Sequence, residues 1–224
     1  MRKKKKKGEL LVVSGFSGVG KGTVIRRLME KHPEYAFSVS ATTRAPRPGE
    51  VDGKDYYFLT REEFDRWLEE ERFLEYAHFF DRSYGTPKEA VEKLRRDGKN
   101  VILDIETEGA MNVNKACPES RLVYIIPPSA ETLKNRIVGR GTETREQIRR
   151  RLEKAVREAE TVSAYDYIVV NDSVEETADE IHRLTMGDTE TRIPREEALA
   201  LCAEIREDLL EILKEFEDCD NIKN

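Results

Sequence analysis

The chain has 224 residues, of which 38% are hydrophobic and 38% are charged. A chain of this length can form one large domain, or a core with inserted lobes, but not several independent domains. The charged share is high, yet short apolar runs such as Leu10-Leu11-Val12-Val13 recur, which indicates a folded protein with a charged surface and excludes a disordered chain. No apolar run approaches the ~18 residues that a membrane span needs.

The negative charge is concentrated at the C-terminus. Residues 187–224 contain 12 acidic and 5 basic side chains, a net of −7, so the rest of the chain carries +1 of the total of −6. Nucleic-acid-binding proteins are more often basic overall, and we expect no nucleic-acid partner. The lysine run Lys3 to Lys7 is expected to be a solvated tail. No apolar signal segment follows it, so the sequence predicts a cytoplasmic protein without a membrane partner.

Short buried strands alternate with amphipathic helices along most of the chain. Strands are expected at residues 10–14, 101–105, 122–126 and 167–170, and helices at 23–31, 129–139, 144–162 and 174–184. This alternation predicts an α/β fold, with a parallel sheet covered by helices on both faces.

Residues 38–85 interrupt this alternation and are rich in Thr, Arg, Pro, Gly and aromatic side chains. Residues 45–49 form a turn-rich stretch, and Asp52-Gly53 is a hairpin signal. Strands at 56–59 and 74–80 are expected on either side of a helix at 61–71. We expect a small mixed α/β lobe inserted into the core. A second irregular piece, residues 139–142, joins two helices.

The segment after Met186 is predicted to be a separate helical extension, with Pro194 in the first turn of its helix. Apolar residues recur there at alternating spacings of four and three: Ala198, Cys202, Ile205, Leu209, Ile212 and Phe216. This seam is shorter than three heptads, so an isolated coiled coil would be marginal. Two interpretations stay open: the helix packs on its own domain, or it pairs with a second copy of the chain as a homodimer.

A glycine-rich loop joins the first strand to the first helix, which is the context of a phosphate-binding loop. Glycines allow the backbone N–H groups to turn toward phosphate oxygens, and the helix N-terminus adds partial positive charge. The candidate triphosphate-binding residues are Gly15, Ser17, Gly18, Val19, Gly20, Lys21, Gly22 and Thr23. In the common motif a hydroxyl directly follows the lysine, whereas here Gly22 does and the hydroxyl comes at Thr23. The GKGT variant occurs in nucleoside monophosphate kinases.

A second phosphate site is predicted in the inserted segment. Arg44 and Arg47 lie three apart in a proline-stiffened turn, so both guanidinium groups can converge on one phosphate. Tyr56 and Tyr84 can add hydroxyl donors to the same dianion. The alternative is that the two arginines are surface charges.

The residues of this segment resemble those of the guanylate kinase family. The stretch TTRAPRPGE (residues 42–50), followed by GKDYYF (53–58), is highly specific, whereas YGT (84–86) alone is weak. The resemblance covers nearly all of residues 10 to about 184. It implies a guanylate-kinase-like domain over 8–186, with core at 8–37 and 87–186, a GMP-binding lobe at about 38–86 and a lid at about 136–151. Residues 187–224 lie outside it, as an acidic helical extension.

The resemblance also implies an activity: Mg²⁺-dependent phosphoryl transfer from ATP to GMP or dGMP in purine metabolism, giving ADP and GDP. By their matching positions, Arg44, Arg47, Tyr56 and Tyr84 hold the GMP phosphate and Ser40 lines that site. Glu75 matches the residue whose carboxylate accepts from guanine N1–H and N2–H₂. The hydroxyl of Thr86 matches one that bonds the base.

An arginine-bearing lid is implied by RIVGRGTE (136–143) and the following RRRL (149–152). Its matching arginines Arg136, Arg140 and Arg151 close over ATP and meet the transferring phosphoryl group, so with Lys21 and Arg44 they are the expected catalytic residues. Asn171 matches a segment near the ATP adenine. No nucleophile is required, and none of His32, His78 and His182 is assigned to catalysis.

Two carboxylates follow a buried strand. Asp104 and Glu106 come at the C-terminal end of Val101-Ile102-Leu103, where parallel sheets bind their ligands. We expect Asp104 in the GMP site, orienting Arg44 or contacting the base. Glu106 is expected, with Thr23, to hold Mg²⁺ directly or through water. Capping of the strand end is the alternative for both carboxylates.

Two other functions stay open. The first is a guanylate-kinase-like interaction module without catalysis, against which the presence of Lys21, Arg44, Arg47 and the lid arginines argues. The second is a nucleoside monophosphate kinase for another base, against which Glu75 and Thr86 argue.

Overall fold

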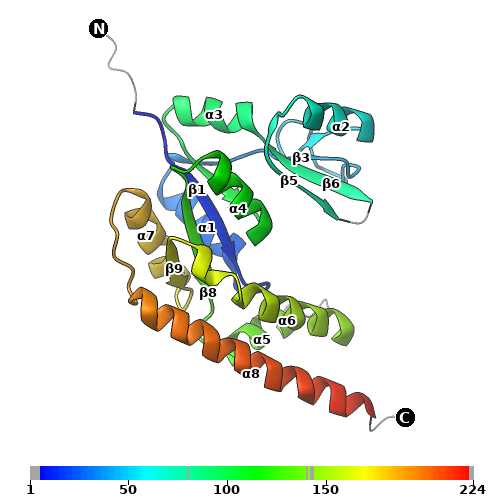
Figure 1. The fold of residues 1–224 in the computed structure, drawn as a ribbon, viewed down its shortest axis with the longest axis vertical. Coiled ribbons are helices and arrows are strands. Elements are labelled where there is room, and N and C mark those ends of the chain that lie inside the picture. Colours follow the sequence, from blue (N-terminus) through cyan, green and yellow to red (C-terminus); the bar gives the residue numbers. More distant parts are fainter. Residues whose placement is uncertain (1–5, 80, 140, 142–143, 222–224) are drawn as a thin grey trace. The chain divides into compact units, whose positions relative to one another are not determined.

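The structure is a computed structural model that describes residues 6–79, 81–139, 141 and 144–221 (Figure 1). The chain divides into two compact units: Met1–Val12 with His32–Arg121, and Val13–Lys31 with Leu122–Asn224. The predicted α/β class is confirmed, with a parallel sheet, flanking helices and a second, mixed sheet. Among the described residues, no helix combines the length and the apolar character that crossing a membrane requires.

The five-stranded sheet has the order β2-β7-β1-β8-β9. Its strands are β1 (Leu10–Gly15), β2 (Tyr35–Phe37), β7 (Asn100–Asp104), β8 (Arg121–Ile126) and β9 (Tyr167–Val170). Strand β2 pairs in parallel with β7, and β8 pairs in parallel with β9. Strand β1 begins in the first unit and ends in the second. Its residues Leu10 to Val13 are fully buried, as expected for a parallel sheet that is covered on both faces.

The first unit also contains the mixed sheet, whose order is β4-β3-β6-β5. Its strands are β3 (Ala41–Thr42), β4 (Tyr57–Phe58), β5 (Phe73–Phe79) and β6 (Arg82–Pro87), and its helices are α2 (Arg61–Glu69), α3 (Lys88–Arg96) and α4 (Thr107–Ala116). Thr60 and Glu63 form a capping box at the start of α2. Ala41, Phe64 and Phe73 make a small hydrophobic core of their own. Helix α4 packs against β5, where the GMP site is predicted.

The second unit holds the remaining helices: α1 (Lys21–Lys31), α5 (Ala130–Val138), α6 (Arg145–Ala159), the 3-10 helix η1 (Val162–Ala164), α7 (Val174–Thr185) and α8 (Arg195–Asn221). Helix α1 packs against α7. Serine and threonine side chains cap three of these helices, at Ser129 of α5, Thr144 of α6 and Ser173 of α7.

Helix α8 packs on its own chain, which is one of the two interpretations that the sequence left open. It runs alongside α6 within the second unit (Figure 1). The seam residues Ala198, Cys202, Ile205 and Leu209 are buried, while Ile212 and Phe216 are partly exposed.

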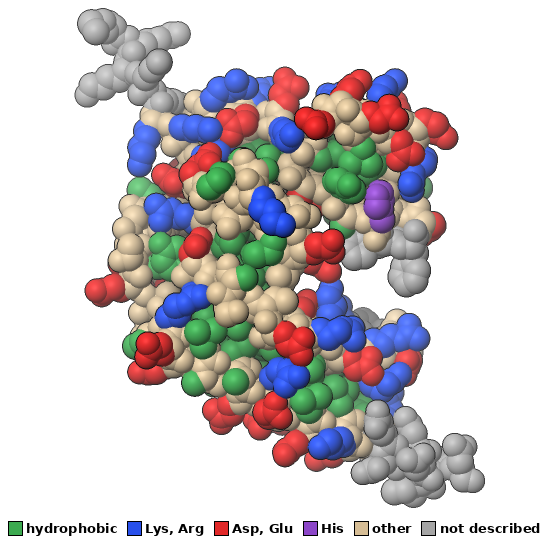
Figure 2. All heavy atoms as spheres, in the orientation of Figure 1, with side chains coloured by type: hydrophobic (Ala, Val, Ile, Leu, Met, Phe, Trp, Pro, Cys, Tyr) green, Lys and Arg blue, Asp and Glu red, His purple; other side chains and the backbone are tan. Residues whose placement is uncertain are grey.

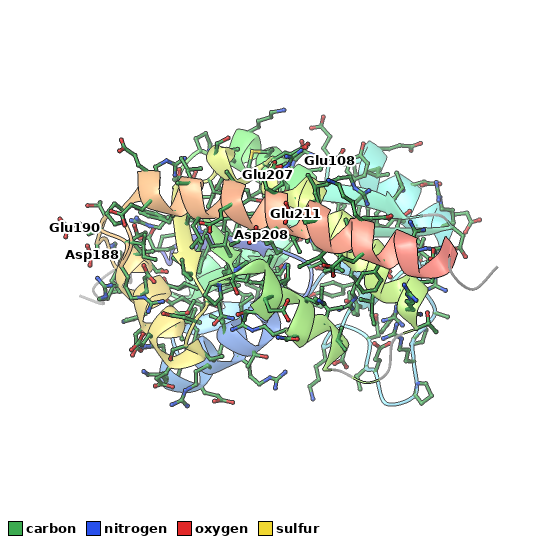
Figure 3. All side chains as sticks on the ribbon, turned by 90° about the horizontal axis from the view of Figure 1, so that it is seen from below. Glu108, Asp188, Glu190, Glu207, Asp208 and Glu211 are labelled. Carbon is green, nitrogen blue, oxygen red and sulfur yellow. The ribbon has the colours of Figure 1, made fainter. Side chains whose placement is uncertain are left out.

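Several acidic side chains of the C-terminal extension lie on the solvent side of α8. Glu207, Asp208 and Glu211 are exposed there (Figure 3). Acidic and basic side chains are interspersed on the face shown in Figure 2. The apolar seam and the acidic residues therefore occupy different sides of one helix, as in an ordinary amphipathic surface helix.

Several short elements were not predicted, namely β2, β3, β6, α3 and α4. Strands β2 and β3 have three and two residues, too few to show a pattern. Helix α4 contains a glycine and two asparagines, which are poor helix formers. The expected hairpin at Asp52-Gly53 is wrong: Gly53 does form a turn, with a positive φ of 73°, but the following strand β4 pairs in parallel with β3.

Candidate functional site

A cavity of about 790 Å³ lies in the first unit, beside β5, β6 and α4. It is lined by six residues predicted for the site: Ser40, Tyr56, Glu75, Tyr84, Asp104 and Glu106. A smaller cavity of about 340 Å³ shares three of these residues and is also lined by Thr86. The fold of the first unit thus brings together side chains that are up to 66 positions apart in the sequence, from Ser40 to Glu106.

Glu75 is the most buried carboxylate of this cavity, with 8% of its surface exposed. It lies opposite Thr86 in the antiparallel pairing of β5 with β6. The Thr86 hydroxyl donates a hydrogen bond of 2.6 Å to Glu75 Oε1. Burial raises the pKa of Glu75 above its ordinary value, and this hydrogen bond opposes the rise. A buried carboxylate destabilises the fold unless hydrogen-bond donors surround it. The Glu75 carboxylate therefore favours a ligand that presents two adjacent N–H donors.

Gly109 of α4 approaches this carboxylate closely and was missed by the sequence analysis. A Cβ atom on Gly109 would lie 2.9 Å from Glu75 Oε2. Gly109 is buried in α4, a helix that was itself not predicted, so the sequence carried no signal for this contact. The α4 backbone therefore forms one wall of the Glu75 site.

Substituting Gly109→Ala tests this wall. The added methyl group must displace the Glu75 carboxylate, so we expect the KM for GMP, the substrate that the sequence predicts for this site, to rise by about tenfold, which corresponds to roughly 1.4 kcal/mol. Alanine favours a helix over glycine by about 1 kcal/mol, and this gain opposes the cost of the contact with Glu75. Thermal stability should therefore change little. Steady-state kinetics with thermal unfolding measures both. Lys115→Ala, at an exposed position of α4, is the control, and an unchanged KM in Gly109→Ala would contradict the assignment.

Other unpredicted side chains line the same cavity: His78 of β5, and Glu108 and Asn112 of α4. The His78 Nδ1 lies 2.7 Å from Ser83 Oγ on β6. This contact joins the two strands that carry Glu75 and Thr86, so His78 takes part in the structure of the site.

Arg44 is held in place by Glu50. Two guanidinium nitrogens of Arg44 donate to the Glu50 carboxylate over 3.0 Å and 2.8 Å, and the backbone N–H of Arg47 donates to it over 2.7 Å. The pair raises the pKa of Arg44 and lowers that of Glu50. The Arg44 guanidinium also lies 5.3 Å from the centre of the Tyr56 ring. Glu50 is part of the TTRAPRPGE motif, but sequence reasoning assigned it no role.

The turn therefore presents its two arginines differently. The Arg44 side chain is 8% exposed, whereas Arg47 is exposed at the surface of the turn. Because the Arg44 guanidinium is already held by Glu50, it loses little conformational entropy when an anion binds, which favours binding.

The phosphate loop belongs to the second unit. Gly18 and Gly20 have φ angles of +91° and +95°, which strongly favour glycine. A Cβ on Gly18 would also lie 2.5 Å from Cγ1 of Ile137 on α5. Lys21 and Thr23 lie in the first turn of α1, and Thr23 is exposed. The predicted strand, loop and helix are all present, with the helix N-terminus at the loop.

Three side chains from distant parts of the second unit hold this loop. The Ser17 N–H donates to Glu158 Oε2 over 2.7 Å. The Val19 carbonyl accepts from Arg136 Nη1 over 2.9 Å and from Asn171 Nδ2 over 2.8 Å. Arg136 also donates to the Asn171 carbonyl, and burial lowers the pKa of its guanidinium. Glu158 was missed, because 141 residues separate it from Ser17.

The structure describes two of the three predicted lid arginines, Arg136 and Arg151. Arg136 lies on α5 against the phosphate loop, and Arg151 is half-buried on α6. Arg140 lies outside the described residues. Direct contact of any of them with a transferring phosphoryl group stays a prediction.

The predicted Mg²⁺ ligands come from different units, Thr23 from the second and Glu106 from the first. Both side chains are exposed. A hydroxyl and a carboxylate oxygen are each the kind of donor that Mg²⁺ accepts, so each residue by itself suits the ion.

Comparison with known proteins agrees with this geometry. The family model described as guanylate kinase matches residues 7–186, which is most of the chain. The chain belongs to the guanylate kinase family.

Individual relatives of this guanylate kinase family member span most of its length. A protein named guanylate kinase from Caldanaerobacter subterraneus subsp. tengcongensis is 46% identical over 204 residues, covering 91% of this chain and 98% of the relative. One from Clostridioides difficile is 48% identical over 176 residues, covering 79% and 86%. The crystal structure of guanylate kinase from Anaplasma phagocytophilum superposes with a TM-score of 0.63 at 35% identity, covering 84% of this chain and 89% of that one.

Proposed function

We propose that the chain is an enzyme that transfers the γ-phosphoryl group of ATP to GMP, giving ADP and GDP. Family membership supports the reaction, and the observation that carries the choice of substrate is the buried Glu75 carboxylate beside Thr86. Guanine presents N1–H and N2–H₂ as adjacent donors, which one carboxylate can accept together. Adenine presents an acceptor at N1, so it would add no matching pair of donors to the one that Thr86 already gives Glu75.

The monophosphate is proposed to bind in the first unit. Arg44 and Arg47 supply charged donors to its phosphate, and the hydroxyl groups of Tyr56, Tyr84 and Ser40 add neutral ones. Glu50 fixes Arg44 before the ligand arrives. Asp104, at the end of β7, is proposed to orient a base or arginine contact. GMP and dGMP share all of these groups, so both are proposed as substrates.

ATP is proposed to bind in the second unit. Its phosphates are proposed to lie against the loop from Gly15 to Thr23, with the positive end of α1 and the Lys21 ammonium as the main charges. The Ser17 N–H already donates to Glu158, so other N–H groups of the loop would meet the phosphates. Asn171 was expected near the adenine, but its side chain is buried and donates to Val19, so it is proposed to support the loop and not to contact the base itself. In the transition state the phosphoryl charge is spread over three oxygens, so positioned cations do most of the catalytic work. Lys21, Arg44, Arg136, Arg140 and Arg151 are the proposed catalytic residues.

Mg²⁺ is proposed as the cofactor, held by Thr23 and Glu106 directly or through water. When bound, the ion neutralises charge on the phosphate oxygens. The proton balance requires no protein nucleophile, because the accepting phosphate oxygen of GMP is already anionic.

Glu50 provides a test of the monophosphate site that does not touch the substrate. In Glu50→Gln the pair with Arg44 loses its charge, so Arg44 is held less firmly and we expect the KM for GMP to rise by roughly tenfold. The KM for ATP should stay unchanged, which serves as the internal control. Steady-state kinetics at varied GMP and at varied ATP measures the two values. Equal rises in both would show a general loss of structure and refute the positioning role.

A coupled assay of ADP release tests the proposed function itself. The enzyme is offered ATP and Mg²⁺ with GMP, AMP, CMP or UMP in parallel reactions. We expect turnover with GMP far above that with the other three. Faster turnover with another monophosphate would favour a kinase of different base specificity. No turnover with any of them would favour a non-catalytic interaction module.

The proposal keeps the sequence-derived limits of the catalytic domain, 8–186, with 187–224 as an extension, and a cytoplasmic location. It does not include a homodimer through α8. Four of the six seam residues on which such a dimer would depend are already buried, and α8 packs against α6 of the same chain.

A further inference from the structure

We propose that Arg192 is a positioning residue for the triphosphate site of the second unit. Arg192 lies in the connection between α7 and α8, beyond the residues 7–186 that the family model matches but within the 204 residues aligned with the Caldanaerobacter relative. The inference rests on the proposed binding of ATP at the phosphate loop. It assigns to the C-terminal extension a role in nucleotide binding that the family match does not supply.

The Arg192 guanidinium spans the end of β9 and the first turns of α7. Its Nη2 donates to the Val170 carbonyl over 2.7 Å and to Asp172 Oδ1 over 2.9 Å. Its Nη1 donates to Glu176 over 2.7 Å, and Nε donates to Glu180 over 2.8 Å. The backbone N–H of Arg192 also donates to Glu180 over 2.6 Å. One side chain thus ties three carboxylates and one carbonyl to the extension.

Two of these groups flank Asn171, which is one of the three residues that hold the phosphate loop. Asn171 is 1% exposed, and its Nδ2 donates to the Val19 carbonyl. A Cβ on Gly20 would lie only 3.0 Å from the same nitrogen. The Gly20 backbone and the Asn171 amide are therefore packed too closely for a side chain to fit between them. By holding Val170 and Asp172, Arg192 fixes the Asn171 amide against the loop backbone.

The chemistry of this position requires an arginine. Glu180 is 1% exposed and accepts hydrogen bonds from the backbone N–H and from Nε of Arg192. A charged donor is needed to compensate the burial of its carboxylate. The Nη1 and Nη2 groups of the same planar guanidinium also reach the Val170 carbonyl and the carboxylates of Asp172 and Glu176. A lysine could supply the charge but not the fork of bonds to Val170 and Asp172.

Arg195 provides a matched control three residues away. Its guanidinium donates to the carbonyls of Ser163, Tyr165 and Asp166, at the other end of β9 and in η1. It anchors the same extension to the same unit through similar bonds. It makes no contact, among those recorded for the described residues, with Asn171 or the phosphate loop.

The experiment compares Arg192→Ala, Arg192→Lys and Arg195→Ala in the full chain. Titration calorimetry measures the Kd for ATP with Mg²⁺, kinetics measures the KM for ATP and for GMP, and thermal unfolding measures stability. We expect both Arg192 variants to raise the Kd and KM for ATP by roughly 3- to 10-fold, with the KM for GMP unchanged. We expect Arg195→Ala to lower the Tm but to leave the Kd for ATP unchanged.

A Kd for ATP that is unchanged in Arg192→Lys would overturn the inference, as would an equal rise in Arg195→Ala. Arg192→Lys keeps a charge beside Glu180, so it decides the question if Arg192→Ala does not fold. The titration needs no GMP turnover. A wild-type chain that binds ATP but does not phosphorylate GMP would refute the proposed function while still testing Arg192.

Discussion

Replacing Lys21 by methionine is expected to lower kcat by about 10³-fold, because one charged donor to the transferring phosphoryl group is lost. Methionine keeps the length and apolar stem of lysine but not its charge. The KM for GMP should change little, since the phosphate loop and the Glu75 cavity belong to different units. The coupled assay of ADP release, at saturating ATP and GMP, measures kcat.

Lys31→Met is the matched control for this prediction. Lys31 lies in the last turn of the same helix, α1, and pairs with Glu175 and Asp179 of α7. Its loss should reduce stability slightly and leave kcat unchanged. If Lys21→Met kept more than a small fraction of the activity, or if the two variants lost activity equally, Lys21 would not have the catalytic role that we assign to it.

The second large effect is expected at Glu75. In Glu75→Gln the side-chain amide can turn a donor toward the donors of guanine, so kcat/KM for GMP should fall by about 10²- to 10³-fold. The KM for ATP should stay near its wild-type value. Kinetics with GMP varied at saturating ATP measures the loss. Retention of wild-type kcat/KM for GMP would contradict the assignment of Glu75 to the base.

The same substitution has a predicted effect on stability, of opposite sign. Burial raises the pKa of Glu75 in the folded state, so its protonation stabilises the fold. That contribution is fully present below the ordinary pKa of 4.5 and is lost as the pH rises through the raised value. At pH 7 the charged Glu75 therefore opposes folding, and Glu75→Gln should increase the free energy of unfolding.

Urea unfolding without nucleotide measures this difference between pH 4 and pH 7. The gain from Glu75→Gln should be largest at pH 7 and should shrink as the pH falls toward 4. Glu62→Gln, at an exposed position of α2 in the same unit, is the control and should show no such trend. A gain that grows as the pH falls would contradict the sign. The expected result would mean that the charged Glu75, which serves binding, lowers the free energy of unfolding.

The parts of the fold that the sequence predicted are those encoded by contiguous residues. Strand β1, the phosphate loop and α1 follow one another without a break, and burial of Leu10 to Val13 agrees with their apolar run. The motif around Arg44 is likewise local, because Glu50 is six residues away. The pairing of Glu75 with Thr86 depends on one antiparallel ladder, and both residues were found through the family motif.

The parts that were missed depend on packing between distant segments. The hydrogen bond from Ser17 to Glu158 spans 141 residues, and Gly109 meets Glu75 only because α4 packs on β5. The seam of α8 was visible as a spacing, but the spacing is the same whether the partner is another copy or α6. Strands as short as β3 form because a neighbouring strand is present, so their own sequence carries no signal.

The most direct test of the account is to follow the phosphates themselves. The full chain is mixed with ATP, Mg²⁺ and GMP, and ³¹P NMR follows the nucleotides with time. We predict that the GMP signal is replaced by the two signals of GDP, in step with the conversion of ATP to ADP and without release of inorganic phosphate. Formation of ADP and inorganic phosphate with GMP unchanged, or no reaction at all, would contradict phosphoryl transfer to GMP.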